Sequence, residues 1–95
     1  MSTDIKASPK RDFRNGHRQR LRDRFIASGG QGMPDYEILE LLLFAAHPRG
    51  DVKPLAKNLL KQFGSLAKVV GAEPRILARI EGMGDAAVTA VKVVE

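Results

Sequence analysis

The sequence predicts a small all-α domain, a bundle of five or six short helices. The clearest evidence is one segment in which apolar residues recur at the spacing of a single helix face: Val52, Leu55, Ala56, Leu59, Leu60 and Phe63. No segment of the sequence alternates apolar and polar residues as a half-buried strand would. Glycine, proline and capping residues divide the 95 residues into short segments, and short connections are typical of helical bundles.

The N-terminal part is predicted to hold a tail and one helix. Residues 1–14 are polar, and we expect them to form a disordered, basic arm. Asn15 is expected to cap a helix over 16–28, because asparagine is favoured at that position and a glycine pair follows the helix. Leu21 and Phe25 form a narrow apolar stripe on this helix and are its candidate anchors.

The second helix, predicted over 34–46, is expected to be the buried centre of the bundle. Pro34 suits the first turn, where the N–H that proline lacks would have no intrahelical partner. Most of the circumference is apolar and consists of Ile38, Leu39, Leu41, Leu42, Leu43 and Phe44. The remaining residues, Tyr36, Glu37 and Glu40, form a polar strip.

A third helix is predicted over 51–63. Asp51 is a favoured capping residue, and Pro54 is tolerated because it falls in the first turn. Gly64 is expected to end this helix in the left-handed conformation that glycine adopts at helix C-termini.

Three shorter helices complete the predicted bundle. Ser65 is expected to cap the first of them, over 66–70. Pro74 begins the next, which should run to about Ile80, and the last should run from Asp85 to the final residue. The chain is thus predicted to consist of an arm (1–14) and a helical domain (15–95), the latter made of two N-terminal helices (15–50) and a tandem unit of hairpins (51–95).

The net charge of +5 is concentrated at the N-terminal end. Residues 1–24 hold eight Lys or Arg against three Asp, whereas basic and acidic residues balance over 25–95. A basic segment on a neutral domain favours polyanions, with nucleic acid the first candidate. A solvated tail without a ligand is the alternative interpretation.

Composition disfavours several classes of function. The chain has no cysteine, which excludes disulfides and thiolate metal sites and fits a cytoplasmic location. No apolar run approaches the roughly 18–20 residues that cross a bilayer, so no membrane partner is expected. His17 and His47 have no evident ligand partners and are expected at the surface or at helix ends. No nucleophile and base are grouped, so we expect no enzyme activity and no catalytic residue in this segment.

Two interhelical turns share one design. The first hairpin, Phe63-Gly64-Ser65-Leu66, and the second hairpin, Glu81-Gly82-Met83-Gly84, each join two predicted helices. Glycine takes positive φ without steric cost, and the helix after the turn starts with unpaired N–H groups. Such groups, at the positive end of a helix dipole, suit a phosphate. A purely structural turn would require the same glycines.

These turns resemble helix-hairpin-helix motifs, which bind nucleic-acid backbones. Their leading glycines are 18 residues apart, and the pair is similar to the tandem helix-hairpin-helix domains of UvrC-type excision nucleases. Three further segments closely resemble the N-terminal region of RadC-type proteins, a family named as DNA repair proteins: residues 16–25, 34–44 and 51–57. The resemblance covers residues 16–95.

The resemblance implies a module that binds duplex or branched DNA without reading its sequence. Hairpin N–H groups would donate to phosphate oxygens, and such contacts position a protein without specifying bases. The residues expected to contact DNA are Gly64, Ser65, Lys68, Gly82, Met83, Gly84, Arg18 and Arg22. A row of lysines (Lys53, Lys57 and Lys61) adds charge or forms a solvated face. Asp85 departs from strong DNA-binding versions, because its carboxylate follows the second hairpin directly and would repel a phosphate.

RadC-type proteins usually continue into an MPN-like (JAB-type) domain with a His-x-His…Asp metal site. The resemblance implies that any zinc-dependent hydrolysis belongs to that C-terminal domain, and no such metal grouping occurs in this sequence. The sequence stops after Val93-Val94-Glu95 without a helix cap, which we interpret as an N-terminal domain taken from a longer protein. No cofactor is expected here, apart from a monovalent cation that hairpin carbonyls sometimes hold. The alternative function is a docking domain for the C-terminal domain, with little DNA affinity.

Overall fold

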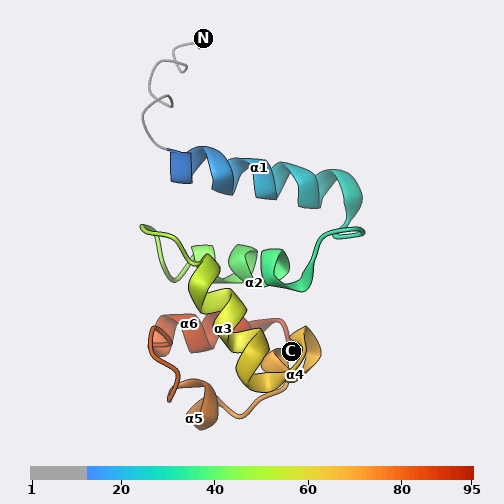
Figure 1. Ribbon diagram of the computed structural model, residues 1–95. Coiled ribbons are helices and arrows are strands. Elements are labelled where there is room, and N and C mark those ends of the chain that lie inside the picture. Colours follow the sequence, from blue (N-terminus) through green and yellow to red (C-terminus); the bar gives the residue numbers. More distant parts are fainter. Residues whose placement is uncertain (1–12) are drawn as a thin grey trace. The chain divides into compact units, whose positions relative to one another are not determined.

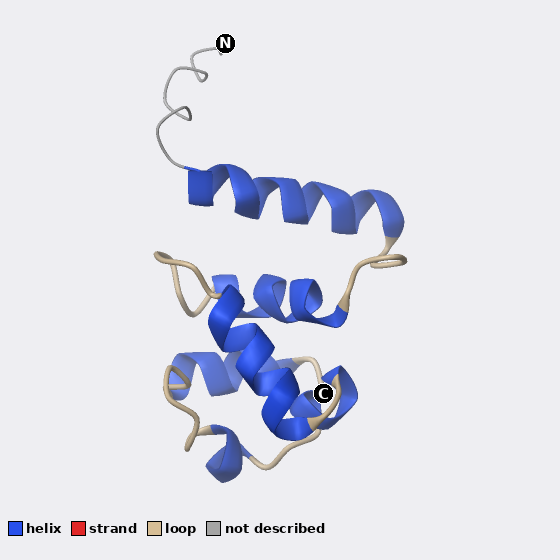
Figure 2. Ribbon diagram, viewed as in Figure 1, coloured by secondary structure: helices blue, strands red, loops and turns tan. Residues whose placement is uncertain are grey.

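The computed structural model describes residues 13–95 and is all-helical, with six helices and no strand over that range (Figures 1 and 2). This confirms the predicted fold class. Residues 1–12, which make up most of the predicted arm, lie outside the described residues. The chain divides into two units, residues 1–32 and 33–95.

The first unit contains α1, Phe13–Ser28. Its predicted end is confirmed, since the N–H of Gly29 donates to the carbonyl of Phe25 at 2.7 Å. Its predicted start is wrong, because Asn15 lies inside the first turn rather than at the cap. Of the two candidate anchors, Leu21 is buried, whereas Phe25 is 39% exposed.

The second unit contains five helices: α2 (Asp35–Phe44), α3 (Lys53–Phe63), α4 (Leu66–Val70), α5 (Pro74–Leu77) and α6 (Asp85–Val93). Helix α2 packs against α3, α4 and α6, and α6 also packs against α4 and α5. The buried apolar side chains of this unit are Met33, Leu39, Leu43, Phe44, Val52, Ala56, Leu59, Val69, Leu77, Met83, Ala87 and Val91. The second helix is therefore central to its unit, as predicted.

The polar strip predicted on α2 is not a solvent-facing strip. Glu37 is 7% exposed and Glu40 is fully buried, while Leu41 and Leu42 are only half-buried. Both residues make interactions within the protein. The sequence pattern could not predict these interactions, because their geometry depends on tertiary packing.

The limits of the other helices differ from prediction by a few residues. Helix α2 ends at Phe44, and the N–H groups of Ala46 and His47 both donate to the carbonyl of Leu43. Helix α3 begins at Lys53, and its N-cap residue is Val52 rather than Asp51. The Asp51 side chain still caps the helix, because its Oδ1 accepts the N–H of Lys53 at 2.9 Å. Helix α5 ends three residues before Ile80, and α6 ends before the last residue. His17 and His47 are half-buried rather than at the surface.

Lys92 links the end of α6 to the end of α4. Its Nζ donates to the carbonyls of Val70 and Ala72, both at 2.8 Å, and lies 2.7 Å from Oε1 of Glu95. Because the last carbonyls of a helix have no intrahelical partner, the lysine supplies donors that α4 lacks.

Replacing Lys92 with methionine is expected to lower the free energy of unfolding by about 1.5 kcal/mol, because two carbonyls lose a charged donor. Methionine keeps the apolar stem, so the loss reports the hydrogen bonds. Urea denaturation followed by circular dichroism measures the change. Arg79→Met is the control, since the Arg79 side chain is exposed and its guanidinium has no polar partner among residues 13–95. Equal destabilisation by both substitutions would contradict the role given to Lys92.

Candidate nucleic-acid interface

The first hairpin has the predicted geometry. Gly64 has φ +100°, and its N–H donates to the carbonyl of Leu60 at 2.7 Å, so it ends α3 in the left-handed region. Ser65 is extended, and its Oγ accepts the N–H of Lys68 at 3.1 Å, which confirms the predicted cap of α4.

Two of the three amides predicted as donors at this hairpin remain available. The N–H groups of Ser65 and Leu66 have no partner among the described residues, whereas the Gly64 N–H is bonded inside the protein. The Lys68 side chain runs beside the turn, since its Cδ lies 3.8 Å from where a Cβ on Gly64 would be. Lys68 and Lys61 are both exposed, so two ammonium groups lie near these amides along the chain.

In the second hairpin only the first glycine needs to be glycine for conformational reasons. Gly82 has φ +95°, a region that favours glycine, whereas Gly84 has φ −85° and ψ −172°, which any residue adopts. The Met83 side chain is buried, and its N–H donates to the carbonyl of Ile80 at 3.0 Å. Neither the side chain nor the amide of Met83 is therefore available to a ligand. The N–H groups of Gly82 and Gly84 have no partner within residues 13–95.

The two hairpins differ in charge. The sequence from Val52 to Ala72 contains four lysines and no acid, and the first hairpin lies within it. The second hairpin contains Glu81 and is followed by Asp85, and both carboxylates are exposed. Asp85 occupies the first turn of α6, where an acid stabilises the helix dipole, but it competes there with an incoming phosphate. The first hairpin thus has the more favourable charge surroundings for an anion of the two.

The basic side chains predicted elsewhere differ in exposure. In α1, Arg18 is only 7% exposed and Arg22 is exposed, so Arg22 offers more surface to a ligand. In the lysine row of α3, Nζ of Lys53 and of Lys57 lie 5.3 and 4.8 Å from the ring centroid of Tyr36. These are cation–π distances, so two of the three lysines have a local structural partner.

Sequence reasoning missed a pocket beside the second hairpin. It has a volume of about 400 Å³ and lies between the loop after α2, the start of α3 and the hairpin. Residues that line it include Arg49, Pro54, Leu55, Asn58, Glu81 and Gly82. Residues 49–58 are separated in sequence from the second hairpin, so only the fold brings the two segments together.

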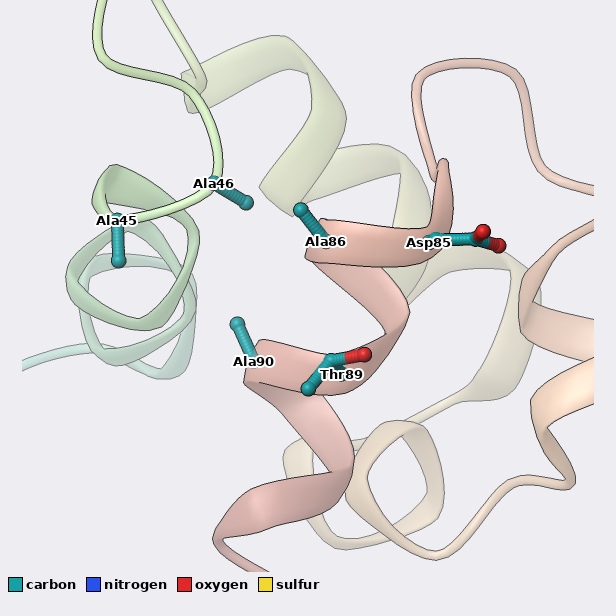
Figure 3. Close-up of a pocket in the computed structure, with 6 residues that line it drawn as sticks. All are labelled: Ala45, Ala46, Asp85, Ala86, Thr89 and Ala90. Carbon is teal, nitrogen blue, oxygen red and sulfur yellow. The ribbon is translucent and has the colours of Figure 1, made fainter.

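A second depression, of about 420 Å³, lies between the end of α2 and α6. In Figure 3 the methyl groups of Ala86 and Ala90 face the side on which Ala45 and Ala46 lie, and the Asp85 side chain points away from them. Four of its six lining residues are alanines, and the other two are Asp85 and Thr89.

Neither a metal site nor a membrane span is found within residues 13–95. No three His, Asp or Glu side chains gather there in a way that would hold a metal ion. None of the helices described has the length and apolar character that crossing a bilayer requires.

The structure defines a small all-α protein of short helices, in which two of the interhelical connections are the glycine-containing hairpins. Residues 15–89 match the family model described as UPF0758 N-terminal, and the chain therefore belongs to the UPF0758 family, the RadC-type group. This confirms the family resemblance inferred from the sequence.

Similar proteins are known from bacteria. A UPF0758 protein of Rhodobacter capsulatus is 53% identical over 75 residues, which are 79% of this chain and 35% of that protein. A UPF0758 protein of Ruegeria pomeroyi is 49% identical over 79 residues, which are 83% of this chain and 35% of that protein. The chain thus spans about a third of the length of these relatives. No solved structure matches it.

Proposed function

We propose that this chain is a DNA-binding module that contacts phosphates through main-chain N–H groups and lysines, without reading base sequence. The observation that carries the proposal is the first hairpin, where the unpaired amides of Ser65 and Leu66 lie in a lysine-rich, acid-free part of the chain. Backbone amides and lysines are the groups that proteins use to hold phosphates. The unpaired amides of Gly82 and Gly84 add a weaker second site beside Asp85.

The charge of the N-terminal region supports the same proposal. The described basic side chains of α1 include Arg20, Arg22 and Arg24, all exposed, and residues 1–12 carry three more basic groups. Such a segment raises the local concentration of a polyanion and speeds association. The whole protein's activity is a further proposal: zinc-dependent hydrolysis in a C-terminal MPN-like domain, as the RadC-type resemblance implies.

Fluorescence anisotropy with labelled duplex and branched DNA tests the proposal. We expect log affinity to fall linearly with log salt, with a slope of about −0.9 for each phosphate neutralised in duplex DNA. Two DNAs of different sequence and equal structure should bind equally. Deleting residues 1–12, which end just before α1, should reduce the slope without abolishing binding. No binding of any DNA at low salt and high protein concentration would refute the proposal.

A second candidate function is docking to the C-terminal part of the longer protein. Val93 and Val94, at the end of α6, are 76% and 50% exposed, and the apolar depression of Figure 3 lies on the same helix. Exposed apolar residues that group together mark interaction surfaces. Gel filtration of this domain with the separately produced C-terminal part of a longer relative tests the idea, and failure to co-elute would count against it.

A further inference from the structure

The pocket beside the second hairpin is not explained by phosphate binding alone. On one side of the pocket Gly82 packs against Leu55, since a Cβ on Gly82 would lie 3.4 Å from both Cδ1 and Cδ2 of Leu55. Pro54 and Leu55 contribute apolar surface, and the volume of about 400 Å³ falls in the range of ligand-binding pockets.

The polar side chains that line the same pocket are His47, Arg49, Asp51, Asn58 and Glu81, of which Asp51 accepts the N–H of Lys53 through Oδ1. The Arg49 guanidinium and the Glu81 carboxylate make no ion pair or hydrogen bond with residues 13–95, although their charges are opposite. The carboxamide of Asn58 accepts a weak hydrogen bond from Gln62 at 3.4 Å, while its NH₂ donates to none of the described residues. The pocket therefore combines one guanidinium, two carboxylates, an imidazole and an amide donor with apolar walls.

A nucleotide carries the complement of the Arg49, Asn58 and Glu81 side chains. Its phosphate pairs with a guanidinium, the exocyclic amine of adenine or cytosine donates to a carboxylate, and an amide reads a base edge. The flat faces of the base suit apolar walls. A base stacked inside a duplex cannot enter a pocket, so the nucleotide must be unpaired or turned out of the helix.

An exposed face of α3 runs from this pocket towards the first hairpin. Pro54, Lys57, Asn58 and Lys61 follow the i, i+3, i+4, i+7 spacing of one helix face, and all four are exposed. From Asn58 to Gly64 the helix rises about 9 Å, which equals two to three nucleotides at about 3.4 Å per step. A strand whose phosphates contact Lys61 and the first hairpin therefore reaches the pocket within a few nucleotides.

We infer that the pocket formed by Arg49, Asn58, Glu81 and Leu55 accepts one unpaired nucleobase of a DNA strand held along α3. The inference rests on the proposed function and specifies its substrate class: DNA with extruded or gapped nucleotides is preferred to intact duplex. The carboxylate of Glu81, which opposes phosphate binding, has a direct use here as an acceptor for a base amine.

Anisotropy and 2-aminopurine fluorescence test this inference, with one bulged 2-aminopurine in an otherwise identical duplex. The chain has no tryptophan, so the emission of the base analogue is measured without protein background. Bulged DNA is expected to bind about five- to tenfold more tightly than intact duplex, and the emission should change on binding because the base leaves its stack. Asn58→Ala should reduce the preference to less than twofold. Gln62→Ala, which removes the neighbour of Asn58 but no lining residue, should retain the preference.

The outcomes separate the two proposals. Equal binding of both DNAs by the unsubstituted chain overturns the pocket inference and leaves the proposed function standing. A preference that survives both Asn58→Ala and Arg49→Gln also overturns it, because the preference would then arise elsewhere. Absence of binding to either DNA refutes both proposals.

Discussion

Gly82→Ser is expected to destabilise the domain by about 2 kcal/mol, because a Cβ strains the backbone at φ +95° and crowds Leu55 at 3.4 Å. Gly84→Ser is expected to be neutral or to stabilise the domain by a few tenths of a kcal/mol. Gly84 has an ordinary φ of −85°, nothing within 4 Å of an added Cβ, and the capping position of α6, where serine is favoured.

Thermal unfolding followed by circular dichroism measures both variants. A loss of about 2 kcal/mol should lower the midpoint by roughly 10 °C in a domain of this size. Gly84→Ser is the matched control for Gly82→Ser, because it makes the same substitution two residues away. A similar loss in both variants would contradict the assignment of the conformational requirement to Gly82 alone.

This contrast also decides how the second hairpin can be tested for DNA binding. A substitution at Gly82 alters folding and binding together, so loss of affinity there would have two explanations. Substitution at Gly84 places a side chain at the start of α6 in open space, beside an unpaired amide. Bulk at Gly84 therefore tests access to the amides without disturbing the turn.

The fold was predictable where local chemistry determines it. The periodicity of α3 and the Gly64–Ser65 pair depend on residues close in sequence, and the structure confirms them. The burial of Glu37 and Glu40 was not predictable in this way. Which side of a helix is buried depends on the elements that pack against it, and helical periodicity alone does not identify those elements.

The candidate site shows the same division. Glycine spacing identified both turns, but it did not reveal that the Met83 amide is bonded to Ile80 or that Gly84 has ordinary dihedral angles. The difference in charge between the two hairpins was predictable from the sequence, because Asp85 directly follows the second hairpin. The pocket was not, because Arg49, Asn58 and Glu81 meet only after three separate segments have packed together.

The lysines beside the first hairpin provide the largest expected effect on binding. Lys61→Gln with Lys68→Gln is expected to lower duplex DNA affinity by roughly 50- to 100-fold at about 0.1 M salt, since each phosphate contact contributes about 0.9 to the salt slope. The slope itself should fall by about 2 for the pair. Both side chains are exposed, so the fold should be unaffected. Anisotropy titrations at several salt concentrations give the affinity and the slope together.

Arg75→Gln with Arg79→Gln is the matched control, because it changes net charge by the same amount at exposed positions around α5. If binding depended only on the total charge of the domain, both double variants would lose affinity equally. A specific phosphate site at the first hairpin requires a much smaller loss in the control. Equal losses would remove the reason for assigning DNA contact to the Ser65 and Leu66 amides, because those amides would then be no closer to the phosphates than the rest of the surface.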